Sequence, residues 1–379
     1  MIRLRKIGFT LLAVSLLAIH AATGQIAEAA APIVGSIKVS GTPLDFETVK
    51  PDNDAAFHEG LLFGLQADGT EVYYNTSGQP AFTLPEHIVP EAEFAEQRAV
   101  VQDTATGLFG FINTKGDIAV PCVYASAGNF SGGVAHVALP GGSEEALIDR
   151  HGRTVAALTE KFSSDFIFTE GLSTAYAPGG SGLIGYINTA GRLAIPYQYH
   201  SGSRGFTEGL AVVQNKAGLY GYIGTSGQTV IPFQYKSAGM FSEGLAAVQN
   251  AKGKWGFINK QGKLVIDYKY ANTGSFSEGL VNVYNSAGKA GFINKAGKLV
   301  IGYQIYNHAF SFREGAALVG ISDSTGKKAD QYGYINTSGK LLTKLIYTRE
   351  SSPFSGCYAV GVTEIGTGYI LNKQGAGKR

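Results

Sequence analysis

The chain has few of the residues that cross-link a small fold or give it charge of one sign. Of its 379 residues only two are cysteine, Cys122 and Cys357, and they stand far apart. Two cysteines so placed do not indicate a disulfide framework or a zinc site. Tryptophan occurs once and methionine twice, against 52 glycines, 21 phenylalanines and 20 tyrosines. This composition is typical of many short strands joined by tight turns.

Long apolar runs are also scarce, and the one near the start has the features of an export signal. Arg3, Arg5 and Lys6 form a short basic region, and residues 7–19 are then almost entirely apolar. The run is too short for a stable anchor, and residues 27–29 fit the small-x-small pattern of a cleavage site. Residues 1–29 are therefore predicted to be a secretory signal peptide, with an uncleaved anchor as the alternative. We expect the remaining chain to be secreted or at the cell surface, outside the cytoplasm and without a membrane span.

The chain also lacks an excess of either charge. Residues 1–29 carry three basic residues and one acidic residue, so their removal leaves basic and acidic residues in equal number. A neutral chain has no long-range field that gathers phosphates. A nucleic-acid partner is therefore not expected.

A near-regular interval organises the rest of the chain. The element Phe-x-Glu-Gly begins at Phe57, Phe168, Phe206, Phe241, Phe276 and Phe312, with weaker copies at Phe94, Phe130 and Phe354. An Asn-x-x-Gly type of turn follows each copy, and its glycine recurs at Gly78, Gly116, Gly152, Gly191, Gly227, Gly262, Gly297, Gly339 and Gly375. Self-similarity at about 36 residues predicts nine copies of one structural unit.

One stretch of the best copy defines the motif. Trp255-Gly256-Phe257-Ile258-Asn259 is followed by the turn glycine Gly262. This resembles the WG repeat family, also called KWG repeats, whose core is Trp/Tyr-Gly-Phe/Tyr-Ile-Asn/Asp. Residues 220–223 and 332–336 match nearly as well, whereas residues 72–75 and 146–149 depart from the pattern. The resemblance covers nearly all of the chain after residue 29, and it implies a repeat architecture without implying a reaction.

The repeats predict an all-β fold. Residues 245–248, 255–259 and 264–266 read as short strands, so a unit supplies two or three antiparallel strands. A lone hairpin is marginal in water, so neighbouring units must share a core. We expect a leading strand within residues 30–56, a tandem array of hairpin or meander repeats over residues 57–375, and a polar tail at 376–379.

Two forms of this array are possible. Three strands per unit favour an open, twisted, solenoid-like array over a closed β-propeller, whose blades have four strands. The chain, however, starts in the phase of a third strand, at residues 41–49, and ends after a second, at residues 369–375. Contact between these two segments would indicate the closed form.

In one copy, the local composition and the repeat pattern predict different secondary structure. Residues 90–102 have a helical composition, but Phe94 and the eight residues after it align with residues 206–214. We therefore predict a strand over residues 98–102, with local helix propensity overridden.

No catalytic, cofactor-binding or metal-ligating residue is assigned. Residues 180–185 fit Gly-x-Gly-x-x-Gly, but they lead into a predicted strand rather than a helix, which favours a hairpin turn. The seven histidines fall at non-equivalent repeat positions and make no metal site. The sequence indicates no enzyme and no cofactor.

Two repeated series could line a binding face. One is acidic: Glu59, Glu170, Glu208, Glu243, Glu278 and Glu314. The favoured interpretation is that each carboxylate accepts backbone N–H groups at its turn, with cation or glycan binding as the alternative. The other is aromatic, and it is expected in the core rather than on the surface: Tyr197, Tyr199, Phe233, Tyr235, Tyr268 and Tyr270.

The sequence thus favours an exported, non-enzymatic binding or scaffold protein. Its expected partner is a protein or a cell-wall glycan, because repeat arrays present extended surfaces. The alternative is a glycan-acting hydrolase, which would need two carboxylates in one cleft. Acids outside the repeat pattern, Asp165, Asp323 and Asp330, are the candidates for such a pair.

Overall fold

The structure is a computed structural model, and it describes residues 56–65, 70–141, 144–160, 162–303, 305–322, 329–364 and 367–373, together with the backbone of 37–45. The predicted signal peptide (1–29), the polar tail (376–379) and most of the segment 30–56 lie outside the described residues. One short 3-10 turn, η2 (Pro178–Gly180), interrupts a chain otherwise made of strands and turns in the described part.

The strands form nine separate antiparallel sheets in the described residues, one for each sequence unit. Unit 1 holds β2 (Leu62–Leu65) and β3 (Glu71–Tyr74), and unit 2 holds β4 (Ile88–Pro90), β5 (Ala99–Asp103), β6 (Leu108–Ile112) and β7 (Ile118–Tyr124). Unit 3 holds β8 (Ser126–Ala127), β9 (Ala135–Ala138), β10 (Glu145–Ile148) and β11 (Thr154–Leu158). Unit 4 holds β12 (Ser163–Ser164), β13 (Leu172–Tyr176), β14 (Ile184–Asn188) and β15 (Leu193–Tyr199).

The remaining units repeat this plan. Unit 5 holds β16 (Ser201–Gly202), β17 (Leu210–Gln214), β18 (Tyr220–Gly224) and β19 (Thr229–Tyr235), and unit 6 holds β20 (Ser237–Ala238), β21 (Leu245–Gln249), β22 (Trp255–Asn259) and β23 (Leu264–Tyr270). Unit 7 holds β24 (Asn272–Thr273), β25 (Leu280–Tyr284), β26 (Ala290–Asn294) and β27 (Leu299–Ile301), and unit 8 holds β28 (His308–Ala309), β29 (Ala316–Ile321) and β30 (Gln331–Asn336). Unit 9 holds β31 (Tyr358–Val362), β32 (Thr367–Lys373) and β1 (Ile37–Asp45).

The turns of unit 6 follow from its sequence. Glu243 and Gly244 both have positive φ, 55° and 84°, and form a two-residue hairpin turn before β21. After β22, the Asn259 side chain accepts hydrogen bonds from the N–H groups of Gln261 and Lys263, at 3.1 and 3.0 Å. The predicted asparagine turn is confirmed, and it returns the chain antiparallel into β23.

The predicted all-β tandem array is confirmed, but the best-formed units have four strands rather than two or three. The additional strand is only two residues long, such as β20, which pairs with β21. A two-residue strand has no hydrophobic alternation, so the sequence pattern did not show it.

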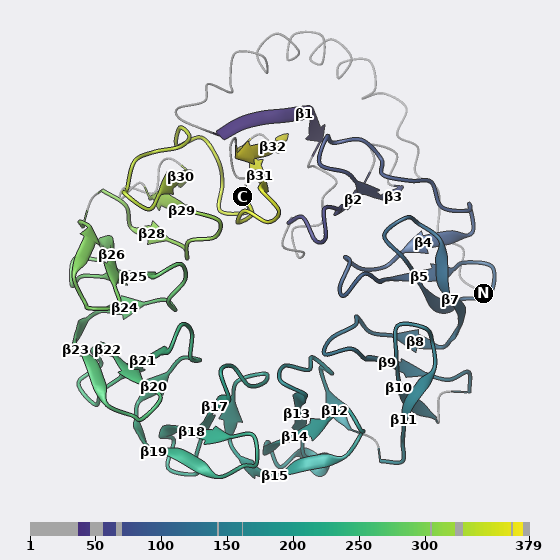
Figure 1. Ribbon diagram of the computed structural model, residues 1–379, viewed down its shortest axis with the longest axis horizontal. Coiled ribbons are helices and arrows are strands. Elements are labelled where there is room, and N and C mark those ends of the chain that lie inside the picture. The colour runs from purple at the N-terminus through teal and green to yellow at the C-terminus, as the bar shows by residue number, and fades with distance from the viewer. Residues whose placement is uncertain are drawn as a thin grey trace, which may run out of the picture.

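The two ends of the array meet. β1 pairs antiparallel with β32, with Ile37 opposite Lys373 and Asp45 opposite Thr367. Phe57 of unit 1 packs with Val360 and Ile370 of unit 9 in one core cluster. Figure 1 shows the nine units arranged around a ring, with β1 lying against β32 at the junction. The closed, propeller-like alternative therefore describes how the units are arranged, because the phase offset of the termini lets β1 complete the last sheet.

The strand predicted within residues 98–102 is confirmed as β5. Its partner β6 pairs with it from Ala99 opposite Ile112 to Asp103 opposite Leu108. Val101 and Ile112 are buried in the core shared by units 1 and 2. Burial in a shared core thus outweighs the local helix propensity of this segment.

The core is divided among the junctions between neighbouring units. At the junction of units 6 and 7, Phe257 and Phe276 are almost fully buried and meet edge-to-face, with ring centroids 5.0 Å apart. Equivalent aromatic pairs join most other neighbours in the described residues, at Tyr73–Phe94, Phe111–Phe130, Tyr186–Phe206, Tyr222–Phe241, Phe292–Phe312 and Tyr334–Phe354. Each unit therefore depends on its neighbours for a core, as the repeat predicts.

The central glycine of the motif has a steric role. A Cβ on Gly256 would come within 2.6 Å of the carbonyl oxygen of Ile266. The pairing of β22 with β23 shifts at this point, which bulges β23 over the glycine. Unit 3 has Ala146 at the equivalent position, and there β10 and β11 pair without a shift from Glu145 to Leu147. The glycine is therefore needed where the outer strand bulges.

Replacing Gly256 by alanine should destabilise the ring by about 1–3 kcal/mol, because the methyl group has to displace backbone. Thermal unfolding of the Gly256→Ala variant measures this. Gly244→Asn is the control, since asparagine tolerates the left-handed region and a Cβ there meets nothing within 4 Å. Equal melting temperatures for the two variants would contradict the steric role.

Candidate functional site

The repeated glutamates form bonds between units. Each carboxylate accepts a hydrogen bond from the hairpin turn of the next unit, as Glu243 does from Gly279 N–H at 3.0 Å. The other bonds of this series are Glu59–Gln97, Glu96–Gly133, Glu170–Gly209, Glu208–Gly244, Glu278–Gly315 and Glu314–Gly356. The favoured interpretation, backbone N–H groups as partners, holds, but the partners lie in the following unit.

These glutamates have a backbone conformation that is unfavourable for their residue type. Glu243 has a φ of 55° and Glu208 a φ of 54°, a region that favours glycine or asparagine over a longer side chain. Glu208 and Glu243 also contact Lys260 and Lys295, at 3.2 and 3.1 Å. The series is thus occupied in joining units rather than in forming an open acidic face.

Glu208 shows the electrostatics of these bonds. Partial burial alone would raise the pKa of its carboxyl, but the hydrogen bond from Gly244 N–H and the nearby Lys260 ammonium outweigh burial and hold the pKa below its usual range. A carboxyl with a lowered pKa in the folded state stabilises the fold above its unfolded pKa. That contribution is lost as the pH falls through the lower, folded-state pKa.

The variant Glu208→Gln should therefore be less stable than the wild type at neutral pH, by about 0.5–1.5 kcal/mol. The difference should shrink as the pH falls, because the wild type then loses the charged contact with Lys260. Unfolding curves at several pH values from neutral to acidic provide the measurement. A difference that grows on acidification would show that the carboxylate is not stabilised as described.

Two units lack this glutamate, and one of them borders a pocket. Unit 9 has Gly356 at the equivalent turn position, and unit 3 has Gly132. A Cβ on Gly132 would come within 2.8 Å of Phe168 Cβ in unit 4, so the junction leaves no room for a side chain there. Between units 3 and 4 lies a pocket of about 710 Å³.

Unit 3 departs from the motif at further positions. Glu145 pairs with Ala138 as Trp255 pairs with Gln249, so a carboxylate replaces the first aromatic ring. Leu147, which replaces the second aromatic residue, belongs to the same core cluster as Phe168 of unit 4. This junction therefore has an aliphatic–aromatic contact in place of the aromatic pair at most other junctions, and a carboxylate beside it.

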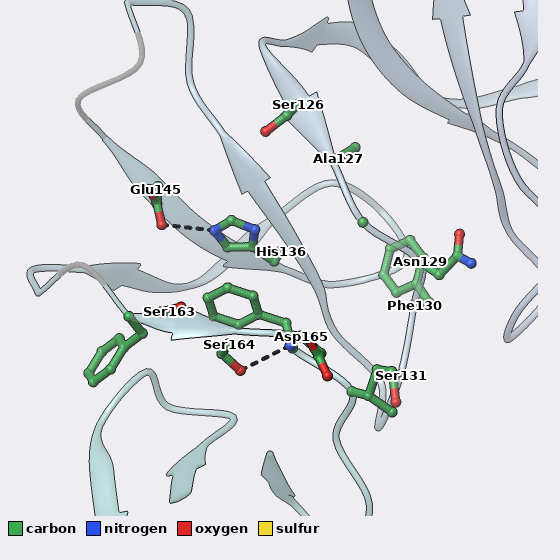
Figure 2. A pocket seen from close by; sticks show the side chains of 14 residues that line it. Ser126, Ala127, Asn129, Phe130, Ser131, His136, Glu145, Ser163, Ser164 and Asp165 are labelled. Atoms are coloured by element: carbon green, nitrogen blue, oxygen red, sulfur yellow. Dashed lines mark hydrogen bonds and ion pairs between the residues drawn. The ribbon is translucent and has the colours of Figure 1, made fainter. Parts of the chain in front are cut away.

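Two stacked rings belong to the lining of the pocket, and Figure 2 labels one of them, His136, beside Glu145. His136 on β9 lies parallel to Phe166 of unit 4, with centroids 3.9 Å apart and 2° between the planes. The imidazole Nε2 is 3.0 Å from the Glu145 carboxylate on β10, and both side chains are about one-fifth exposed. Phe166 has a φ of 51°, an unfavourable value for an aromatic residue.

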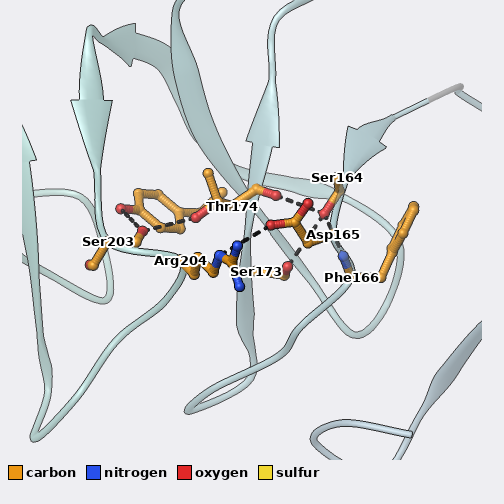
Figure 3. A network of polar contacts seen from close by, with 8 residues as sticks. Ser164, Asp165, Phe166, Ser173, Thr174, Ser203 and Arg204 are labelled. Carbon is orange, nitrogen blue, oxygen red and sulfur yellow. Dashed lines mark hydrogen bonds and ion pairs between the residues drawn. The ribbon is translucent and has the colours of Figure 1, made fainter. Parts of the chain in front are cut away.

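A polar network supports the strained residue (Figure 3). Ser164 Oγ donates to the Thr174 carbonyl at 2.7 Å and accepts from Phe166 N–H at 3.0 Å. Asp165 lies between Ser164 and Phe166 in the sequence, and its carboxylate is 3.5 Å from Arg204 Nε of unit 5. Serine hydroxyls and an amide complete the polar lining at Ser126, Ser131, Ser163 and Asn129.

The candidate acids are only partly brought together. Asp165 lines the pocket with Glu145, which the sequence did not single out. Asp330 lies elsewhere, 3.4 Å from His308, and Asp323 lies outside the described residues. Each pocket carboxylate already contacts a basic side chain, His136 or Arg204.

The glycine motif and the aromatic series can be located in the structure. Residues 180–185 lead from η2 into β14, so the glycine motif is a hairpin as expected. Within the aromatic series, Tyr199, Tyr235 and Tyr270 are buried, and their half-buried partners Tyr197, Phe233 and Tyr268 pack against the core.

The part of the chain that the structure describes has no cluster of three or more potential metal ligands. Nor does that part contain a helix long and apolar enough to cross a membrane.

Fold and motif together define a β-repeat scaffold whose units are joined by backbone-bonded glutamates. The chain belongs to the WG-containing repeat family, whose model matches residues 109–138, 184–218, 220–255, 255–285, 291–323 and 332–360, just over half of the chain. The unmatched residues 139–183 hold Glu145 and the unit 4 side of the pocket.

Several solved structures are similar to this chain at low sequence identity. The computationally designed Ika8 protein is 14% identical over 89% of this chain and 100% of its own, with a TM-score of 0.47. BamB from Moraxella catarrhalis is 11% identical over 90% and 99% (TM-score 0.45), and the C-terminal WD40 domain of Sif2 is 9% identical over 91% and 100% (TM-score 0.41). No curated protein matches the chain. At these scores the likeness carries no inference about function.

Proposed function

We propose that this chain is an exported, non-enzymatic binding scaffold that presents the pocket between units 3 and 4 to a partner in the cell envelope. The observation that carries the proposal is that the pocket lies at the junction where unit 3 departs from the repeat. Glu145 lines the pocket, and Gly132 and Leu147 lie at the same junction, near Phe168 of unit 4. If the changes in unit 3 only weakened the repeat, we would expect a packing defect at this junction. Instead, the changes accompany a pocket with a polar lining and the positive φ of Phe166.

The partner classes that fit are a protein or a cell-wall polysaccharide. Pull-down with the chain lacking residues 1–29 separates them, using purified cell-wall polysaccharide in one arm and envelope protein extract in the other. We expect retention in one arm that weakens in the Asp165→Asn variant. Equal recovery with the wild type and with an unrelated control protein in both arms would contradict the proposal.

Export rests on residues 1–29 and has its own test. Expression of the full chain followed by N-terminal sequencing of the protein outside the cytoplasm should give a start at residue 30, after Ala29. Recovery of only the uncleaved chain inside the cell would contradict export without affecting the binding function.

A second candidate function, glycan hydrolysis, is favoured by the presence of both Glu145 and Asp165 in the pocket lining. Hydrolysis with a carboxylate pair needs one carboxyl to donate a proton to the leaving oxygen. Incubation with soluble cell-wall glycan and an assay for new reducing ends distinguishes the functions. Turnover that disappears in both Glu145→Gln and Asp165→Asn would establish the hydrolase instead of the scaffold.

A further inference from the structure

The pocket combines a small exposed apolar area with hydrogen-bonding groups on two sides. Phe166 is buried and stacks face to face on His136, which is about one-fifth exposed, and Ile167 is 39% exposed. Glu145 lies against His136, while Asp165 lies on the unit 4 side (Figure 2). A ligand in the pocket would thus meet one apolar face and carboxylate oxygens from two units.

Both carboxylates of the pocket already have partners. Glu145 lies 3.0 Å from the Nε2 atom of His136, and Asp165 lies 3.5 Å from the Arg204 guanidinium. Carboxylates held by such partners still accept hydrogen bonds, because each oxygen has more than one lone pair. They are less available to a cationic ligand, and they repel phosphate and other anions. The lining therefore favours a neutral ligand that donates several hydrogen bonds.

We propose that this pocket binds a short neutral oligosaccharide, a ligand class that rests on the proposed binding function. Sugar hydroxyls donate to the oxygens of Asp165 and Glu145 and exchange hydrogen bonds with Ser131 and Asn129. The apolar face of a sugar ring packs against Ile167 and the exposed part of the His136 ring. The volume of about 710 Å³ lies within the range of pockets that hold small organic ligands.

Two variants test the site without disturbing the core. Asp165→Asn changes a carboxylate whose side chain is 41% exposed. Gly128→Leu adds a side chain to the lining, and a Cβ there meets only the His136 carbonyl oxygen, at 3.8 Å. The matched control is Asp267→Asn, which changes an exposed acid on β23 in unit 6.

The experiment is isothermal titration of the chain lacking residues 1–29 with cellotriose, maltotriose and triacetylchitotriose, and with tri-arginine as a cationic probe. We expect at least one trisaccharide to bind the wild type and the control equally, and to bind Asp165→Asn and Gly128→Leu about tenfold more weakly or not at all. Circular dichroism and melting temperature verify that both variants are folded.

Three outcomes would overturn the proposal: no trisaccharide binds the wild type, one binds all variants equally, or tri-arginine alone binds. None of these decides the binding function itself. If envelope material is still retained in the pull-down while the trisaccharides neither bind nor compete, the scaffold stands and the ligand class is wrong. If nothing is retained and a trisaccharide binds, the saccharide site stands and the wider envelope role is wrong.

Discussion

Deleting residues 1–45 should lower the free energy of unfolding by about 3–6 kcal/mol relative to deleting residues 1–36. The two chains differ only in β1, whose pairing with β32 spans Ile37–Lys373 to Asp45–Thr367. Loss of β1 removes these hydrogen bonds and exposes the edge of β32, which also promotes association with other chains. Chemical denaturation and light scattering of the two truncated chains provide the measurement.

The comparison also decides between the two forms of the array. In a closed ring, β1 joins unit 9 to the start of the chain, and Phe57 packs on unit 9 beside it. An open array would carry residues 37–45 as an appendage of the first unit. Equal denaturation midpoints for the two truncations would therefore contradict the closed ring.

Replacing Phe257 by alanine should cost about 3–5 kcal/mol. The ring is fully buried and packs edge-to-face on Phe276 of the next unit, so its removal leaves a cavity at the junction of units 6 and 7. Phe257→Leu is the matched control, because unit 3 has Leu147 at this position, and it should cost distinctly less. Urea unfolding of both variants measures the difference.

Amide exchange in the neighbouring unit provides a second measurement on Phe257→Ala. If the core belongs to junctions rather than to single units, Phe257→Ala should also increase amide exchange in β25 of unit 7. Exchange that increases only in unit 6, or a loss below about 1 kcal/mol, would show that the unit does not depend on its neighbour.

Much of the fold could be predicted because each unit repeats the same local instructions. The turn at Asn259 and the strand β22 follow from the residues themselves. Even the strand β5, in a segment of helical composition, followed from its alignment with residues 206–214. Nine copies of a weak signal at one interval make a strong one.

The features that the sequence missed are those set by distant parts of the chain. β20 is two residues long and has no pattern of its own. Glu243 bonds to Gly279 in the next unit, and a glutamate before a glycine gives no sign of which turn it reaches. Ring closure was visible only as a phase offset between the two ends, and the count of predicted strands pointed the other way.

The pocket was missed for a related reason. The sequence showed that residues 146–149 depart from the motif and that Asp165 stands outside it. In the sequence, however, a departure in one copy looks the same whether the motif has simply been lost or a binding site has formed there. Only the structure places His136 against Phe166 and brings Glu145 and Asp165, from different units, into one lining.

In the proposed function, the repeated residues hold the ring together while the departures from the repeat in unit 3 bind the partner. The most direct test of this claim measures melting temperature and envelope-material binding in the same two variants, Glu208→Gln and Asp165→Asn. We predict a lower melting temperature with unchanged binding for Glu208→Gln, and weakened binding with a nearly unchanged melting temperature for Asp165→Asn. The reverse pattern, or a loss of binding in Glu208→Gln alone, would contradict the claim.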